Sequence, residues 1–236
     1  MSKPFQFKEF SIEQDRCAMK IGTDGVLLGA WADQENAFSI LDIGAGTGVI
    51  SLMLAQRSAA EVIDAIEIDD EAYEQCVENF EASDWGDRLF CYHASLQEFI
   101  EEIEDSYDLI VSNPPFYTDT YQSEDKQRNK ARFEDSMPFE HLFLAASKLL
   151  SPQGKFAMIA PFKEEKELCV LAKTHGLFLN KACHVKGTET SDYKRSLLEF
   201  SFTKTDTQYT ALTIEIARHE YTPEYIALVK DFYLKM

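Results

Sequence analysis

ILDIGAGTGVISLMLAQR, residues 40–57, passes from a short apolar run through three closely spaced glycines into a helical pattern. This order is typical of a buried strand, a tight loop and a helix. Small residues in the loop let the backbone approach a ligand closely, and the first turn of the helix offers free N–H donors. The stretch therefore predicts an α/β domain with a nucleotide-type site where this strand ends.

Strand-like runs and helical patterns alternate along the rest of the chain. The strand-like runs lie at 40–43, 62–68, 88–92, 107–112, 155–160, 178–185 and 197–203. The helical patterns lie at 49–57, 70–82, 96–103, 139–150 and 163–175. Because each of the first five strands leads into a helix, we expect a seven-stranded, mostly parallel sheet with helices on both faces and an antiparallel hairpin at one edge.

The two ends of the chain are expected to pack on this core. Residues 5–12 have the spacing of short strands, and residues 23–25 offer a turn and a cap for an apolar helix at 26–32. Thr222-Pro223 predicts the start of a terminal helix that reaches residue 234. No repeat or linker interrupts the chain, so we expect a single domain over residues 1–236.

The chain is strongly acidic, with 41 acidic and 23 basic residues among 236 and a formal net charge of −18. Such a surface repels polyanions, so any contact with nucleic acid must be local. No apolar run reaches the roughly 20 residues that span a bilayer, so we expect no membrane association and a cytoplasmic protein. The five histidines and five cysteines lack metal-ligand spacing, so no metal site is expected.

The spacing of the glycines distinguishes between classes of nucleotide site. A dinucleotide fingerprint reads G-x-G-x-x-G, but Val49 occupies the place of its third glycine, and no G-x-x-x-x-G-K-[ST] is present. Asp42, before the loop, suits a ligand with an ammonium group better than a pyrophosphate. With Glu67 at the end of the next strand, DIGAGTG resembles the first motif of the class I S-adenosylmethionine (SAM) methyltransferases.

That resemblance implies a Rossmann-like fold with SAM as cofactor. It assigns Glu67 to the two ribose hydroxyls and places Ile68 against the adenine ring. Ser95 stands where many family members carry an Asp that contacts the adenine amino group. Because Ser95 also begins a capping box with Glu98, it acts either as a cap alone or as a cap and an adenine contact. The resemblance assigns the methionine end of SAM to Asp42, Gly44, Gly46 and Gly48.

A second motif, Asn113-Pro114-Pro115-Phe116, follows another strand-like run. An amino group conjugated to a purine is a poor nucleophile, because its lone pair is delocalised into the ring. The Asn113 side-chain carbonyl and the Pro114 backbone carbonyl can accept its two hydrogens and turn the lone pair outward. The prolines stiffen this turn, and Phe116, with Tyr117, offers a face on which a base stacks at roughly 1–3 kcal/mol. This chemistry needs no general base.

N-P-P-[FY] resembles the motif of amino-group methyltransferases, which act on adenine N6, guanine N2 or a glutamine side chain. With DRCAMKIGTDGVLLGAWA at 15–32 and FYLKM at 232–236, the whole chain is similar to the bacterial tRNA1(Val) adenine-37 N6-methyltransferase family. This resemblance implies a cofactor-covering extension at 1–39, a SAM-binding catalytic core at 40–204 and a C-terminal extension at 205–236. It places over the methionine end of SAM the residues Lys20, Thr23, Asp24 and Gly25.

A cluster of cations after the second motif is a candidate for phosphate contacts. Its members are Lys126, Arg128, Lys130 and Arg132. In an extended loop these alternate side chains point the same way, toward one face of an RNA. The alternative is a solvated loop whose cations pair with nearby acids. Further candidates for RNA contact are the pair Lys194 and Arg195 and the pair Lys181 and Lys186.

The family resemblance implies that the substrate is an adenine of a tRNA anticodon loop, splayed out of its stack. Two alternatives remain open from sequence. One is the same chemistry on another amino group, such as guanine N2 in rRNA or a small molecule. The other is an inactive protein that binds SAM or RNA, against which the intact Asn113 argues. The sequence indicates no oligomeric state.

Overall fold

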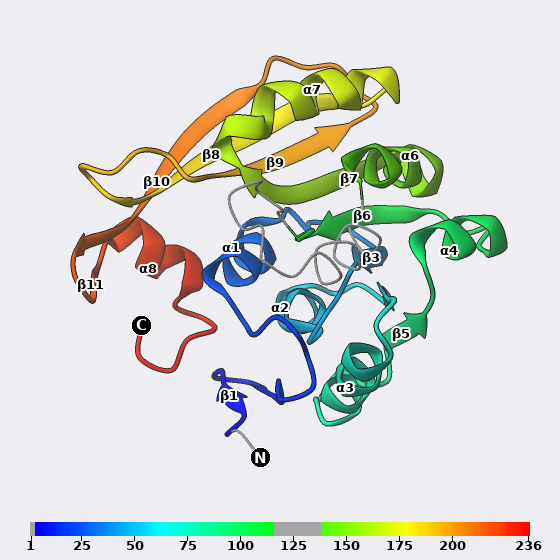
Figure 1. Ribbon diagram of the computed structural model, residues 1–236, viewed down its shortest axis with the longest axis horizontal. Coiled ribbons are helices and arrows are strands. Elements are labelled where there is room, and N and C mark those ends of the chain that lie inside the picture. The colour runs from blue at the N-terminus through cyan, green and yellow to red at the C-terminus, as the bar shows by residue number, and fades with distance from the viewer. Residues whose placement is uncertain (1–2, 116–137) are drawn as a thin grey trace, which may run out of the picture.

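The computed structural model describes residues 3–115 and 138–236. Within these residues, nine strands form one sheet in the order β11-β10-β8-β9-β7-β6-β3-β4-β5 (Figure 1). The strands are β3 (Ser39–Ile43), β4 (Val62–Glu67), β5 (Leu89–His93), β6 (Tyr107–Ser112), β7 (Leu150–Pro161), β8 (Phe178–Thr188), β9 (Arg195–Ser201), β10 (Gln208–Ala217) and β11 (Glu220–Tyr221). Five strands that are adjacent in the sheet, β7, β6, β3, β4 and β5, pair in parallel, as the alternating pattern predicts.

Helices cover both faces of this sheet (Figure 1). On one face lie α1 (Thr23–Trp31), α2 (Val49–Arg57), α3 (Asp70–Glu81) and α8 (Pro223–Val229). On the other lie α4 (Leu96–Glu102), α6 (Phe139–Leu149) and α7 (Glu165–Thr174), the last preceded by the short 3-10 turn η1 (Phe162–Glu164). Three layers of this kind are typical of a doubly wound α/β domain.

Strand β3 shows why the sheet is buried on both sides. Ile40 packs among the side chains of α1 and α2, whereas Leu41 and Ile43 pack on the side of α4 and α6. Successive strand residues point to opposite faces, so a strand covered twice is apolar in almost every position. Apart from the half-buried Ser39 at its start, β3 has one polar residue, Asp42, which is fully buried on the α2 face.

The antiparallel pair is present but does not lie at the edge of the sheet. β9 runs antiparallel to β8, as expected, and it also pairs antiparallel with β7. β10 then pairs in parallel with β8, and the short β11 pairs with β10, so the sheet extends two strands beyond the predicted seven. Most residues of β10 are exposed or only half-buried, and Leu212 alone among them is fully covered, so its sequence lacks the apolar signal of a core strand.

Two helix boundaries differ from the sequence-based expectation. α1 begins at Thr23, with Gly22 as its N-cap and no side-chain cap, so residues 23–25 form its first turn rather than a cap. α8 begins as predicted, with the Thr222 hydroxyl accepting from the Tyr225 amide at 3.2 Å and Pro223 in the first turn. It ends at Val229 rather than near residue 234.

The two ends of the chain lie side by side on the core (Figure 1). The short strands β1 (Phe5–Gln6) and β2 (Ser11–Ile12) pair with each other, as their spacing predicts. The Lys8 amide donates to the Phe232 carbonyl at 2.8 Å, and the Phe7 ring stacks on Tyr233 with centroids 5.7 Å apart. None of the helices in the described part of the chain is long and apolar enough to cross a membrane.

Candidate active site

The loop between β3 and α2 is shaped by three glycines in the left-handed region of backbone space. Gly44, Gly46 and Gly48 have φ of 76°, 55° and 78°. The amides of Gly44 and Ala45 both donate to the Ile66 carbonyl, at 2.9 and 3.1 Å, which ties the loop to the end of β4. A Cβ added at Gly44 or Gly46 would meet no atom within 4 Å, so their backbone faces open space. The loop is therefore a cradle that a ligand can approach closely.

Gly48 closes this loop for a different reason, and we expect its replacement to destabilise the fold. A Cβ at Gly48 would lie 2.5 Å from Phe80 Cε1 and 2.9 Å from Cys76 Sγ. Gly48→Ala should cost about 2–5 kcal/mol of unfolding free energy, from overpacking and left-handed strain together. Gly176→Ala is the matched control, because Gly176 has φ of 76° with nothing within 4 Å. Urea unfolding should give about 1–2 kcal/mol for that control, and equal losses would show that crowding at Gly48 contributes nothing.

Asp42 anchors the loop from beneath. Its Oδ2 accepts from the Ser51 hydroxyl at 2.8 Å, and its Oδ1 is buried with no hydrogen-bond partner among the described residues. Burial, with the nearby charge of Glu67, raises the pKa of Asp42 to about 7. A buried acceptor without a donor is costly to a folded protein. Asp42 thus provides an acidic oxygen that a cationic ligand group can stabilise.

The raised pKa of Asp42 predicts a particular pH dependence of stability. The folded state holds this proton more tightly than the unfolded chain, so the contribution of Asp42 to stability falls as pH rises from about 4 to about 7. Asp42→Asn removes this titration and should flatten the decline. Urea unfolding of both proteins at intervals across this window measures the difference. An identical pH profile for the two proteins would contradict the assigned pKa.

Glu67, at the end of β4, faces the same loop. Its Oε2 accepts from the Gly46 amide at 2.8 Å, and its Oε1 accepts from the Ile68 and Asp69 amides at 2.8 and 3.0 Å. Three backbone donors therefore hold one carboxylate beside the glycine cradle. A carboxylate fixed in this way is suited to accept from a pair of hydroxyls on a bound ligand.

A cavity of about 370 Å³ opens beside Glu67. It brings together four of the residues assigned to the cofactor from sequence, namely Gly44, Glu67, Ile68 and Ser95. The capping box at Ser95 is present, since the Ser95 hydroxyl accepts from the Glu98 amide at 3.2 Å and the Glu98 carboxylate accepts from the Ser95 amide at 3.0 Å. Ser95 thus caps α4 and lines the cavity at once. Ile68 is 58% exposed there, so it offers an accessible apolar surface to a planar ligand.

Helix α6 contributes residues to this cavity that the sequence interpretation missed. His141, Leu144 and Lys148 all line it, and they lie three and four positions apart on one face of α6. Residues at this spacing share a helix face. The exposed Leu144 within an otherwise buried apolar pattern is the signal that could have indicated them.

Asn113 lies at the end of β6, directly beside the glycine loop. Ile43 and Ser112 are register partners in β3 and β6, and the Ser112 hydroxyl donates to the Ile43 carbonyl at 2.9 Å. The next residues in the two strands, Gly44 and Asn113, therefore leave the sheet side by side, at the carboxyl ends of the parallel strands. A Cβ at Gly25 would lie 3.8 Å from Asn113 Nδ2, so the amide packs against the first turn of α1. Pro114 is buried beside it, and Pro115 is half-buried.

The segment before α1 reaches the glycine loop through α3. Asn79 of α3 donates to the carbonyls of Glu13 and Thr47, at 3.0 and 2.9 Å, and accepts from the Glu13 amide at 2.9 Å. Of the residues predicted to cover the methionine end of SAM, Gly25 packs against Asn113. Lys20 is exposed, and Thr23 lines a separate cavity. This segment and the loop are therefore coupled by side-chain hydrogen bonds.

The cations near β8 and β9 are largely engaged within the protein. Arg195 Nε donates to Asp24 Oδ2 at 2.7 Å, which joins the start of β9 to α1. Lys181 Nζ lies 2.9 Å from Asp33 and 3.4 Å from Glu199, and Lys186 Nζ lies 3.1 Å from Glu189. Lys181 is therefore part of an internal charge network rather than a free phosphate contact. Lys194 is exposed just before β9, at the same end of the sheet as the carboxyl ends of β6 and β7, where Asn113 lies.

Several predicted substrate contacts lie outside the described residues. They are Phe116, Tyr117, Lys126, Arg128, Lys130 and Arg132. Among residues 3–115 and 138–236, no three His, Cys, Asp or Glu side chains are grouped so that they could hold a metal ion.

Comparison with known proteins identifies the family of this chain. Residues 19–178 match the family model of the methyltransferase small domain. A tRNA1(Val) (adenine(37)-N6)-methyltransferase of Flavobacterium johnsoniae is 63% identical over 98% of this chain and 100% of its own length. The chain belongs to this family. Another member, from Christiangramia forsetii, is 59% identical over 100% of this chain and 99% of its own, so the similarity includes both ends.

Solved structures agree on the fold. A predicted O-methyltransferase from Agrobacterium tumefaciens superposes with a TM-score of 0.67 at 20% identity, covering 89% of this chain and 96% of that one. TYW2 of P. horikoshii, solved in complex with MeSAdo, has a TM-score of 0.59 at 14% identity, covering 85% and 71%. At these identities the likeness establishes the class I methyltransferase fold alone.

The residues around the cavity fit SAM. The cradle of Gly44 and Gly46 leaves open space, and Glu67 borders the cavity. Asp42 carries a buried acidic oxygen to which no group in the described part of the chain donates. A cofactor with an ammonium group, a sulfonium centre, ribose hydroxyls and a planar base complements these groups in charge and in hydrogen bonding.

Proposed function

We propose that this chain is a SAM-dependent methyltransferase that acts on N6 of adenine 37 in tRNA1(Val). The position of Asn113 carries the proposal, since it leaves β6 at the edge where the glycine cradle and Glu67 border the cofactor cavity. Full-length similarity to family members with this printed activity supports the substrate. A pure SAM-binding protein would have no use for an amide at that point.

The residues of this chain divide the work of holding SAM. Asp42 and the glycines 44, 46 and 48 hold the methionine end, and Glu67 accepts from the ribose hydroxyls. Ile68 and Ser95 border the adenine, with Ser95 serving as cap and contact together. The first turn of α1 covers the methionine end together with the preceding segment, which includes Lys20. When bound, SAM supplies an electrophilic methyl group on its sulfonium centre.

Asn113 and Pro114 prepare the amino group of the adenine. The Asn113 side-chain carbonyl and the Pro114 backbone carbonyl accept its two hydrogens, so the lone pair turns out of the ring system and toward the methyl group. Gly25 leaves room for the Asn113 amide, and the buried Pro114 fixes the direction of its own carbonyl. The methylated nitrogen then loses a proton to water, so the chain needs no general base. Phe116, with Tyr117, stacks on the flipped base.

The tRNA contacts the edge of the sheet that carries Asn113, with the anticodon loop over the site. Lys194 lies on this edge, and Arg195 positions α1 through Asp24. The cations at 126–132 supply further phosphate contacts. Because the rest of the protein is strongly acidic, the affinity for RNA is confined to this face and depends on salt concentration. The whole of residues 1–236 acts as one domain, with 1–39 and 205–236 packed on the catalytic core.

A transfer assay with separated substrate pools tests this function. The purified chain is incubated with labelled SAM and with tRNA, rRNA or small metabolites from cells that lack the gene. We expect label in the tRNA pool alone, recovered as N6-methyladenosine after nucleoside digestion. Label in rRNA as methylguanosine, or in the metabolites alone, would retain the fold and cofactor and refute the substrate.

A further inference from the structure

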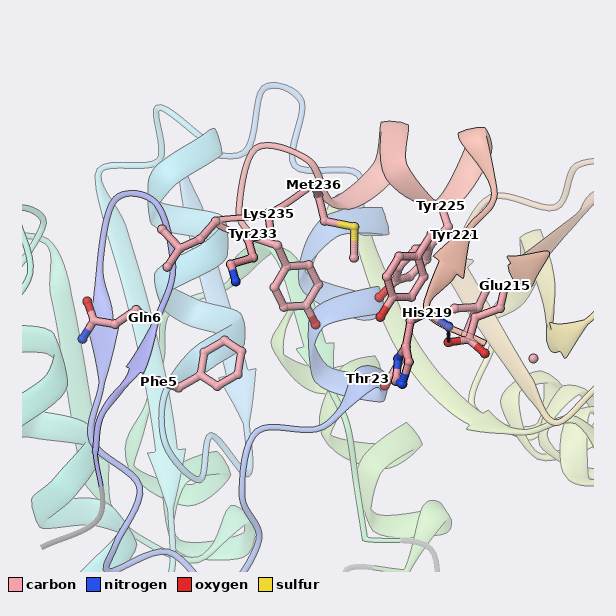
Figure 2. Close-up of a pocket in the computed structure, with 13 residues that line it drawn as sticks. Phe5, Gln6, Thr23, Glu215, His219, Tyr221, Tyr225, Tyr233, Lys235 and Met236 are labelled. Atoms are coloured by element: carbon pink, nitrogen blue, oxygen red, sulfur yellow. Dashed lines mark hydrogen bonds between the residues drawn. The ribbon is translucent and has the colours of Figure 1, made fainter. Parts of the chain in front are cut away.

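A second cavity, of about 780 Å³, lies between the C-terminal segment and the start of α1. Its lining includes Phe5, Tyr221, Tyr225, Tyr233, His219 and Lys235, and we refer to it as the Tyr221 cavity. Figure 2 shows the side chains of His219, Tyr221 and Tyr225 facing those of Tyr233 and Met236 from the C-terminal segment. Nothing in the SAM site or in the chemistry at Asn113 requires this group of aromatic residues.

The aromatic rings form a wall with polar tips. Tyr225 is 3% exposed, and its ring centroid lies 5.3 Å from that of the half-buried Tyr221. Tyr233 is also half-buried, and its ring lies 6.3 Å from that of Phe5. These distances are those of packed rings, and because Tyr221 and Tyr233 are only half-buried, part of each ring remains accessible from the cavity. Bases of a single-stranded nucleic acid stack on accessible aromatic side chains of this kind.

The charged groups around the cavity fit a nucleotide rather than an apolar ligand. Lys235 and His219 are exposed at its rim, where a phosphate can approach. Glu215 also lines it, and its carboxylate accepts from the His219 amide at 3.3 Å. The phenol and imidazole groups can bond to the edge of a base, and Glu215 can accept from an amino group.

The Tyr221 cavity adjoins the catalytic site through α1. Thr23 lines the cavity, and Gly25 packs against Asn113. Both residues belong to the first turn of α1, so a single helical turn borders the cavity and contacts the catalytic amide. Gly187 also lines the cavity, and it lies in β8 two residues beyond Val185, the register partner of Arg195. One RNA loop can therefore reach Asn113 and the Tyr221 cavity together.

We propose that the Tyr221 cavity binds a second, unstacked nucleotide of the same tRNA whose adenine is presented to Asn113. This inference rests on the proposed function, because it assumes that the substrate is an RNA loop. Unpaired loop bases are recognised by stacking on aromatic side chains and by hydrogen bonds to their edges. The cavity contributes affinity and positions the loop, and it takes no part in the chemical step.

Steady-state kinetics with full-length protein and tRNA test this assignment. Tyr221→Ala should raise KM for tRNA about 5- to 150-fold, which is the loss of one stacked base, with kcat and the Kd for SAM changed by less than about twofold. Tyr221→Phe keeps the ring and should restore most of the affinity. Phe38→Ala is the matched control, since Phe38 is 57% exposed just before β3, at the opposite edge of the sheet, and should leave KM unchanged.

A charge reversal gives an independent test if Tyr221→Ala fails to fold. Lys235→Glu changes an exposed side chain, and it should raise KM for tRNA and reduce the salt dependence of binding by about one contact. Lys173→Glu makes the same charge change at the end of α7, away from the cavity, and should have no such effect.

The outcomes separate this inference from the proposed function. An active wild-type enzyme whose KM for tRNA is unaffected by Tyr221→Ala and Lys235→Glu would overturn the inference alone. The inference would also be overturned if Tyr221→Ala weakened SAM binding as much as tRNA binding, or if the control variants Phe38→Ala and Lys173→Glu raised KM for tRNA as much as the test variants. A wild-type protein that methylates no tRNA would overturn both.

Discussion

Asn113→Ala lowers kcat for methyl transfer by about a hundred- to a thousand-fold or more, because the amino group is no longer held with its lone pair turned outward. SAM binding should remain within about twofold of the wild type, since Asn113 lies at the end of β6 and does not line the cofactor cavity. Single-turnover kinetics measure the first quantity, and isothermal titration with SAM measures the second.

The matched control for this variant is Asn180→Ala. Asn180 lies near the start of β8, at the opposite end of the strands, where its amide donates to the Thr203 carbonyl. Its replacement should leave both kcat and SAM affinity unchanged. A loss of SAM affinity in Asn113→Ala as large as the loss of rate would assign Asn113 to the cofactor site instead.

Glu67→Gln is expected to weaken SAM binding about 10- to 150-fold. The carboxylate accepts from three backbone amides around the cradle, and an amide side chain cannot accept from donors on both of its ends. Charge-assisted hydrogen bonds contribute about 1.5–3 kcal/mol each, so the loss of one of them gives this range. Titration calorimetry with SAM and with S-adenosylhomocysteine measures the change.

Glu101→Gln serves as the control for Glu67→Gln. Glu101 lines the same cavity from α4 and is exposed. Its replacement by Gln removes the same charge and leaves the three backbone hydrogen bonds of Glu67 intact. We expect its SAM affinity to stay within about threefold of the wild type. If both variants lose affinity equally, the role of Glu67 is general electrostatics and the ribose assignment is wrong.

The catalytic half of the sheet could be predicted from sequence because its signals are local. DIGAGTG requires left-handed glycines beside a strand end, and the structure has them at residues 44, 46 and 48. Strands β3, β4 and β6 are buried on both faces, so they appear as short apolar runs that lead into helices. The meeting of Gly44 and Asn113 follows from the parallel pairing of β3 and β6.

Features that depend on long-range packing were not accessible from sequence. β10 is largely exposed, so nothing in its pattern shows that it extends the sheet beyond β8. The ion pair between Asp24 and Arg195 joins residues 171 positions apart, and a pattern of charges in the sequence could not reveal it. The Tyr221 cavity likewise combines residues from both ends of the chain, whose aromatic content alone indicates only core packing.

The most direct test of this account is to locate the methyl group in valine tRNA. Unmodified tRNA1(Val) is incubated with SAM and the purified chain, digested with a base-specific nuclease, and its fragments are analysed by mass spectrometry. The account predicts one added methyl group, on N6 of adenine 37, that is absent after incubation with Asn113→Ala. A methyl group on another nucleotide, or undiminished methylation by Asn113→Ala, would contradict it.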